Sequence, residues 1–178
     1  MDPTRSSDAR ATLDTEAIVR EILAEYALPP RGHHGVVHWA RVLENGLRIA
    51  EQTGANARVV TLFALFHDAR RQNEAVDPGH GARGGELARA TRSRWYDASD
   101  AEVELLVEAC RLHTDGRTEG DVTLQACWDA DRLDLGRVGI APLPHRLCTD
   151  AGRSLLHWAD ARAVTGHVPS LVTEVWKR

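Results

Sequence analysis

The sequence has few cysteines and no long apolar run, and each shortage argues against a class of protein. Its 178 residues include three cysteines, Cys110, Cys127 and Cys148, without CxxC spacing. This odd number argues against a disulfide framework or a zinc knuckle, and it indicates a reducing, cytoplasmic environment. No stretch reaches the ~18 apolar residues of a membrane span, and the first ten residues lack the apolar core of a signal peptide.

Lysine is nearly absent, and the balance of charge is slightly acidic. Lys177 is the single lysine among 22 basic residues, and the net charge is −4 with histidine neutral. A nucleic-acid polymer is therefore not an expected partner, since such binding usually needs a strongly basic face. The arginines instead provide many groups that can bind small anions with two parallel hydrogen bonds.

Apolar residues recur with helical rather than alternating spacing, and no internal repeat or low-complexity tract is present. This pattern predicts one all-α domain over 12–178, after a disordered N-terminal tail over 1–11. The run 59–66 is apolar on all sides, so it predicts a central buried helix. Asp100 is expected to cap the fifth helix. The predicted helices cover 12–27, 34–53, 56–72, 78–91, 101–113, 122–135 and 150–163.

Residues that can bind metal are concentrated at the ends of these helices. A helical bundle can surround an ion if each helix supplies one or two ligands. His67 and Asp68 end the apolar run and diverge by about 100° around the helix axis, so a common site must lie over the groove between them. The set drawn from five helices or helix ends is His34, His38, His67, Asp68, His80, His113, Asp129 and Asp131.

Four of these residues, with their neighbours, resemble the HD-domain superfamily of metal-dependent phosphohydrolases. His38 begins HWARV, His67 and Asp68 end FALFHD, and Asp131 lies in DADRLD. The resemblance covers most of the chain, from about 34 to 140. It implies a helical bundle of the HD-domain type, with one divalent ion held by His38, His67, Asp68 and Asp131. Asp129 and Asp134 are expected to be salt-bridge partners rather than ligands.

His80 and His113 extend the pattern to H…HD…H…H…D, the order found in members of the superfamily with two metals. The resemblance then implies that Asp68 bridges to a second ion held by His80 and His113. These two histidines could instead orient substrate or donate protons. The implied cofactor is one or two divalent ions of Fe, Mn, Co, Zn, Ni or Mg, because histidine and carboxylate ligands suit many metals.

Arginines near the doublet predict an anionic substrate. Arg70 and Arg71 follow it by two and three residues, and Arg83 follows His80 by three. Guanidinium groups bind phosphate oxygens and stabilise developing negative charge, although Arg70 and Arg71 could also pair with surface carboxylates. We expect a small phosphate ester or nucleotide as substrate. Asp68, Arg70 and Arg71 are the predicted catalytic residues; the predicted substrate contacts are His34, Arg70, Arg71 and Arg83.

The sequence leaves three functions open. The first is a metal-dependent phosphohydrolase with a metal-activated water as nucleophile. The second is a di-iron oxygenase of the same fold, which the ligand order does not separate from the first. The third is a non-catalytic, ligand-sensing HD module. The general acid stays unassigned, because some related nucleotidases carry a glutamate where Arg71 and Gln72 stand here, and Glu74 is expected in a loop. The sequence does not fix the oligomeric state.

Overall fold

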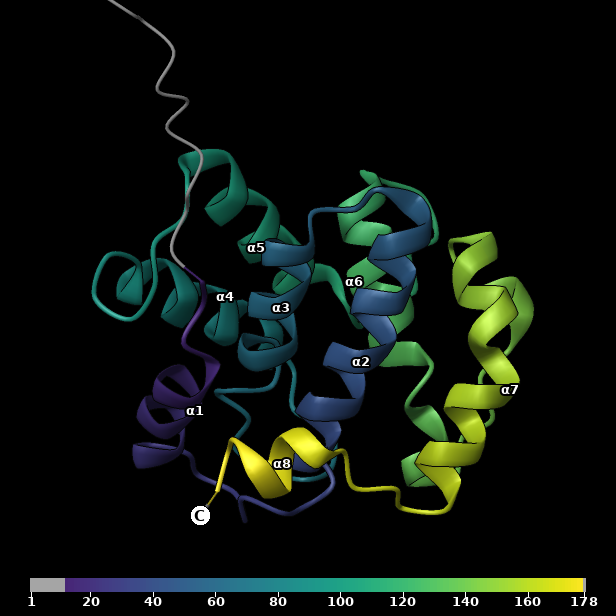
Figure 1. Cartoon of the computed structure of the whole chain (residues 1–178), viewed down its shortest axis with the longest axis horizontal. Helices are drawn as coiled ribbons and strands as arrows, with labels where there is room; N and C mark the ends of the chain where they lie inside the picture. The colour runs from purple at the N-terminus through teal and green to yellow at the C-terminus, as the bar shows by residue number, and fades with distance from the viewer. Residues whose placement is uncertain (1–11, 178) are drawn as a thin grey trace, which may run out of the picture.

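The computed structural model describes residues 12–177, whose helices surround one buried helix, α3 (Figure 1). α3 packs against α2 along its length and also contacts α4, α5 and α6, which confirms the predicted all-α fold. The predicted tail over 1–11 lies outside the described residues. The helices are α1 (Thr15–Ala24), α2 (Val36–Thr53), α3 (Ala57–Phe66), α4 (His80–Thr91), α5 (Asp100–Leu112), α6 (Val122–Arg132), α7 (Asp150–Val164) and α8 (Ser170–Glu174), with 3-10 turns η1 (Leu135–Val138) and η2 (Pro144–Arg146).

The apolar run predicted to be central forms the core of the molecule. Val59, Val60 and the five residues 62–66 are 0% exposed. Within the run Thr61 alone is partly exposed, and a helix that is apolar on nearly every side is expected at the centre of a bundle. α1 and α8 lie together at one end of the bundle in Figure 1, where Trp176 Nε1 donates a hydrogen bond to Thr15 Oγ1 at 3.1 Å.

Several predicted helix ends are wrong: α1 is Thr15–Ala24 rather than 12–27, and α6 ends at Arg132 rather than at 135. Two further errors, at α3 and α5, have a clear local cause. α3 ends at Phe66 rather than at 72, because the chain tightens into turns in which the Ala69 N–H donates to the Phe66 carbonyl. Ser99, not Asp100, caps α5. Its side chain accepts from the Glu102 N–H, and the Glu102 carboxylate accepts from the Ser99 N–H, which forms a capping box. α8 was not predicted.

Glycines let α4 approach its neighbours closely. A Cβ added at Gly84 would lie 2.2 Å from the Phe66 carbonyl oxygen, and one added at Gly81 would lie 2.1 Å from the Cys110 carbonyl oxygen. Only glycine fits at either contact. The first turns of α4 are therefore held against the ends of both α3 and α5. No helix within residues 12–177 has the length and apolar character needed to cross a membrane.

Candidate metal centre

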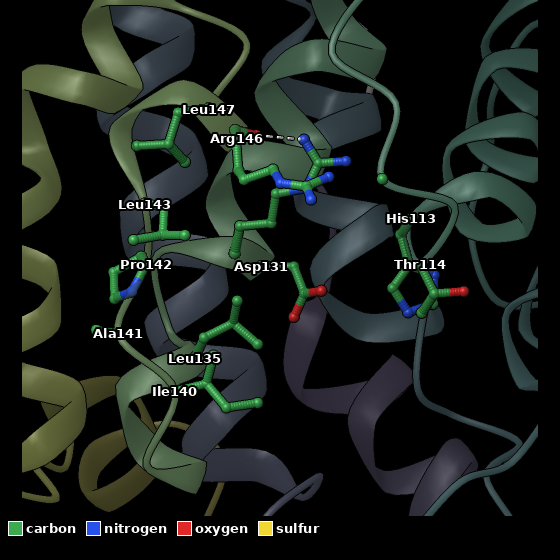
Figure 2. Close-up of a pocket in the computed structure, with 12 residues that line it drawn as sticks. His113, Thr114, Asp131, Leu135, Ile140, Ala141, Pro142, Leu143, Arg146 and Leu147 are labelled. Carbon is green, nitrogen blue, oxygen red and sulfur yellow. Dashed lines mark hydrogen bonds between the residues drawn. The ribbon is translucent and has the colours of Figure 1, made fainter.

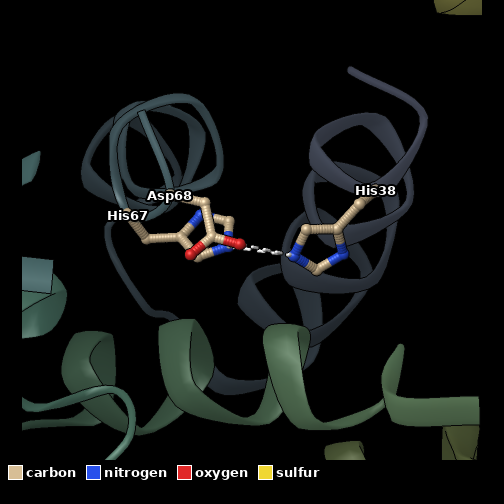
Figure 3. Close-up of side chains that lie close together, drawn as sticks. All are labelled: His38, His67 and Asp68. Carbon is tan, nitrogen blue, oxygen red and sulfur yellow. Dashed lines mark hydrogen bonds and ion pairs between the residues drawn. The ribbon is translucent and has the colours of Figure 1, made fainter. Parts of the chain in front are cut away.

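The first group of metal-capable side chains joins α2, α6 and the end of α3. His38 lies in the first turn of α2, and its Nε2 is 3.0 Å from Nε2 of His67, which caps α3 (Figure 3). The next residue, Asp68, places its Oδ2 3.6 Å from each of these nitrogens. Asp131, in the last turn of α6, has Oδ1 3.3 Å from His38 Nε2 and 3.8 Å from His67 Nε2.

The second group lies on the other side of the same carboxylate. Asp68 Oδ1 is 3.2 Å from Nε2 of His80, the first residue of α4, and 4.0 Å from Nε2 of His113, which caps α5. The two Nε2 atoms are 3.0 Å apart. One oxygen of Asp68 therefore faces His38 and His67, and the other faces His80 and His113. This arrangement suits a carboxylate that bridges two ions.

The hydrogen bonds at Nδ1 fix which nitrogen of each histidine is free. His67 Nδ1 donates to the Phe63 carbonyl at 3.1 Å, His80 Nδ1 to the Asp77 carbonyl at 2.7 Å and His113 Nδ1 to the Cys110 carbonyl at 2.6 Å. Carbonyl oxygens can only accept, so the proton of each neutral ring is on Nδ1. Nε2 then presents a lone pair to the centre, which is the arrangement that a metal-ligating histidine needs.

Burial sets the charges of the centre. It lowers the pKa of His67 to about 3 and also lowers the pKa of His113, so both rings are neutral at physiological pH. Burial raises the pKa of Asp68, but the histidines around it, His67 first, hold that pKa well below its usual range. Burial opposes the charged form of His80, yet contact with Asp68 raises its pKa. The centre thus combines the neutral rings of His67 and His113 with the ionised carboxylate of Asp68.

The side chains fit divalent ions. Asp68 Oδ1 is buried and accepts no hydrogen bond from any described residue, which is costly for a carboxylate. Within each of two groups, the potential ligand atoms all lie within 4.8 Å of one another. The first group is His38, His67 and Asp68, and the second is Asp68, His80 and His113. A metal–nitrogen distance of about 2.0–2.1 Å puts two ligands of one ion roughly 3–3.5 Å apart. Most spacings in both groups lie near this range.

Comparisons with known proteins identify the family. No protein-family profile matches the chain, and no curated protein matches its sequence. Among solved structures, it is similar to the crystal structure of a predicted HD superfamily hydrolase from an uncultured Thermotogales bacterium. The two share 31% sequence identity over 85% of this chain and 86% of that chain, with a TM-score of 0.62. The chain belongs to the HD superfamily. The two-metal variant stays a prediction.

Asp134, three residues after the candidate ligand Asp131, orients His38. Its Oδ2 accepts from His38 Nδ1 at 2.7 Å, and its two oxygens accept from Arg41 Nε at 2.6 Å and Nη2 at 3.0 Å. The predicted salt-bridge role of Asp134 is confirmed. Asp129 differs from that prediction, because it forms no ion pair with a basic side chain within residues 12–177. Its carboxylate instead accepts hydrogen bonds from the Cys148 N–H, the Thr149 N–H and the Thr149 hydroxyl at the start of α7.

Arg71 lies among the six candidate ligands, which together are called the HD site. It is 8% exposed, and its Nη1 is 3.2 Å from His80 Nε2 and 3.5 Å from Asp68 Oδ1. Its Nη2 and Nε donate to the carbonyls of Ala75 and Asn73, which anchor the guanidinium in the loop before α4. Of the three arginines that the sequence nominated, Arg71 is the one whose charge reaches the ligands.

Arg70 and Arg83 pair with carboxylates outside the two groups of candidate ligands. Arg70 Nη2 donates to Glu25 Oε2 at 2.5 Å near the surface, and the structural reason is that α3 ends four residues earlier. Arg83 Nη2 donates to both oxygens of Asp77 at 2.7 Å. The alternative in which Arg70 pairs with a surface carboxylate therefore describes this structure. A part for either arginine in catalysis or substrate binding stays a prediction.

His34 lies beside the HD site and pairs with Glu74. The ring of His34 is 6.4 Å from that of His38, and its Nδ1 is 2.5 Å from Glu74 Oε2. Glu74 lies in a loop, as predicted, with one third of its side chain exposed. Burial is the main cause that lowers the pKa of His34. Its predicted contact with substrate stays a prediction.

A cavity of about 400 Å³ opens beside the centre. His113 and Asp131 line one side, as Figure 2 shows, and the segment from η1 to η2 lines the other. Asp131 is the most exposed of the six candidate ligands, with 14% of its side chain accessible. Sequence reasoning missed this cavity, although the uncharged run 138–144 marks its wall.

Proposed function

We propose that the protein is a metal-dependent phosphohydrolase that acts on a small phosphate ester. The observation that carries the proposal is the bridging position of Asp68, with two free histidine nitrogens on each side. Divalent ions held there would supply Lewis acidity toward phosphate oxygens and lower the pKa of water. The similarity to a protein described as a predicted HD superfamily hydrolase supports hydrolysis as the reaction.

The residues of the chain have distinct parts in this proposal. His38, His67, Asp68 and Asp131 would hold one ion, and Asp68, His80 and His113 a second. The Arg71 guanidinium, held 3.5 Å from Asp68, would stabilise the negative charge that develops on phosphate oxygens. This fixed positive charge beside the ligands favours a phosphate substrate over molecular oxygen, so we place hydrolysis before the oxygenase alternative.

The test is phosphate release from a panel of phosphomonoesters and nucleotides. We expect turnover with Mn²⁺, Co²⁺, Fe²⁺ or Mg²⁺, and Asp68→Asn should reduce kcat/KM at least about 10³-fold because it removes a shared ligand. Asp150→Asn is the matched control, since its carboxylate is fully exposed. Elemental analysis should find close to two ions per chain. Oxygen consumption by the iron-loaded protein without any phosphate release would contradict the proposal.

A further inference from the structure

The cavity beside the HD site has an apolar wall. Leu135, Ile140, Pro142, Leu143 and Leu147 line it opposite Asp131 and His113 (Figure 2). Ile140 and Leu143 are 54% and 50% exposed, so two large aliphatic side chains face solvent beside a strongly polar centre. Its volume of about 400 Å³ lies within the usual range for small-molecule sites, roughly 300–1,000 Å³.

Hydrogen bonds hold this wall in place. The Ile140 N–H donates to the Leu135 carbonyl at 3.2 Å, and the Arg146 N–H donates to the Leu143 carbonyl at 2.9 Å. Buried Arg132, at the end of α6, donates from Nη1 to the Arg146 carbonyl at 2.8 Å. The segment therefore presents a fixed apolar surface to the cavity, and its position is tied to the helix that carries Asp131.

An arginine is left free at the same cavity. Arg146 lines it and is exposed, and its guanidinium makes no hydrogen bond or ion pair with any residue in the range 12–177. Arg132, in contrast, uses its N–H groups on the carbonyls of Arg146 and Arg117. Arg146 can therefore donate to an anion in the cavity.

We propose that the substrate is a phosphate monoester of an apolar alcohol, aromatic or branched aliphatic. Its apolar part packs on the wall formed by Ile140 and Leu143, and Arg146 contacts its phosphate. The placement of that phosphate next to Asp131 rests on the proposed function. The occupant follows from continuity: the wall and two candidate ligands line one cavity, so an ester whose phosphate lies beside Asp131 can pack its alcohol part on the wall.

The test measures binding rather than turnover. The full-length, Mn²⁺-loaded protein is titrated calorimetrically with phenylphosphonate and with methylphosphonate, which share the anionic group and differ in apolar area. We expect phenylphosphonate to bind about tenfold or more tightly. The double variant Ile140→Asn/Leu143→Asn should bring the two affinities within about twofold without weakening methylphosphonate. Leu47→Asn, at an exposed leucine outside this cavity, is the matched control. Arg146→Gln should weaken both ligands by a similar factor of about five.

Equal affinities for the two phosphonates, or no binding of either, would overturn the inference. So would a wild-type dimer that the double variant converts to a monomer in sedimentation, because the wall would then be an interface. The proposed function fails separately. A preference for phenylphosphonate without hydrolysis of any ester would contradict the proposed hydrolysis and support the apolar binding wall. Hydrolysis with no preference for apolar esters would support the proposed hydrolysis and contradict the apolar substrate.

Discussion

Asp134→Asn should weaken metal binding although Asp134 touches no ion in the proposed arrangement. Asp134 accepts from His38 Nδ1 and twice from Arg41, and its side chain is 1% exposed. Asparagine keeps one oxygen and gains an NH₂ group, so one of its sides must face donors without an acceptor. Arg41 loses its counter-charge in both orientations of the neutral amide, and His38 also loses the partner that keeps Nε2 free for a metal when the NH₂ group faces its Nδ1.

The structure sets the size of both effects. Removing one partner of a buried ion pair costs about 3–5 kcal/mol. We expect about 3 kcal/mol of lost unfolding free energy here, because Arg41 keeps its hydrogen bond to the His167 carbonyl at 2.9 Å. Loss of a group that orients a ligating histidine lowers metal affinity by about 10–100-fold. The first effect reports on Arg41, and the second reports on His38.

Two measurements separate these effects. Urea unfolding of the metal-free variant gives the stability loss, and calorimetric titration with Mn²⁺ or Zn²⁺ gives the change in affinity. Asp150→Asn is the control, because Asp150 is fully exposed and pairs with Arg153 on the surface of α7. A folded Asp134→Asn protein with wild-type metal affinity would refute the reasoning that Asp134 sets the orientation of His38.

Three further outcomes follow from local contacts. Asp77→Asn should cost about 2–3 kcal/mol in urea unfolding, because the carboxylate binds Arg83. Burial raises the pKa of Asp77, but the Arg83 guanidinium outweighs burial and holds that pKa below its usual value. The stability difference between the wild type and Asp77→Asn should therefore be present above pH ~4, and it should vanish as the pH falls through the folded pKa. Gly84→Ala should cost about 1–3 kcal/mol by pushing α4 off α3, unlike Glu86→Ala on the exposed face. Burial raises the pKa of the Cys148 thiol to about 12. Cys148 should therefore react with Ellman's reagent at pH 8 roughly 10³-fold more slowly in the folded protein than in the protein unfolded in urea. Equal rates in the two states would contradict this.

The sequence predicted the ligand set more fully than it predicted the helix ends. His38, His67, Asp68 and Asp131 carry their motif in the adjacent residues, and the apolar run 59–66 predicts the buried helix that delivers the doublet. Both signals are local, so they can be read along the chain. The structure brings the six predicted ligands together, while the number of ions stays a prediction.

Features that depend on contacts between distant residues were not predictable. The pairing of Arg70 with Glu25 joins residues 45 positions apart, and nothing near Arg70 indicates that partner. The cavity wall likewise matters only because the segment 135–147 folds back beside His113. The capping box at Ser99 was a different failure: its Ser-x-x-Glu pattern is local, and choosing Asp100 overlooked it.

The positions of the histidines explain why one supporting residue is especially sensitive. His67 and His113 cap helices, where carbonyls near the last turn are available to orient Nδ1. His80 opens α4 and uses the carbonyl of Asp77 in the same way. His38 lies in the first turn of α2, and its Nδ1 donates to a carboxylate 96 residues away. Backbone acceptors survive any side-chain substitution, whereas Asp134 does not. Mutations that disturb histidine orientation without touching a ligand should therefore act mainly through His38.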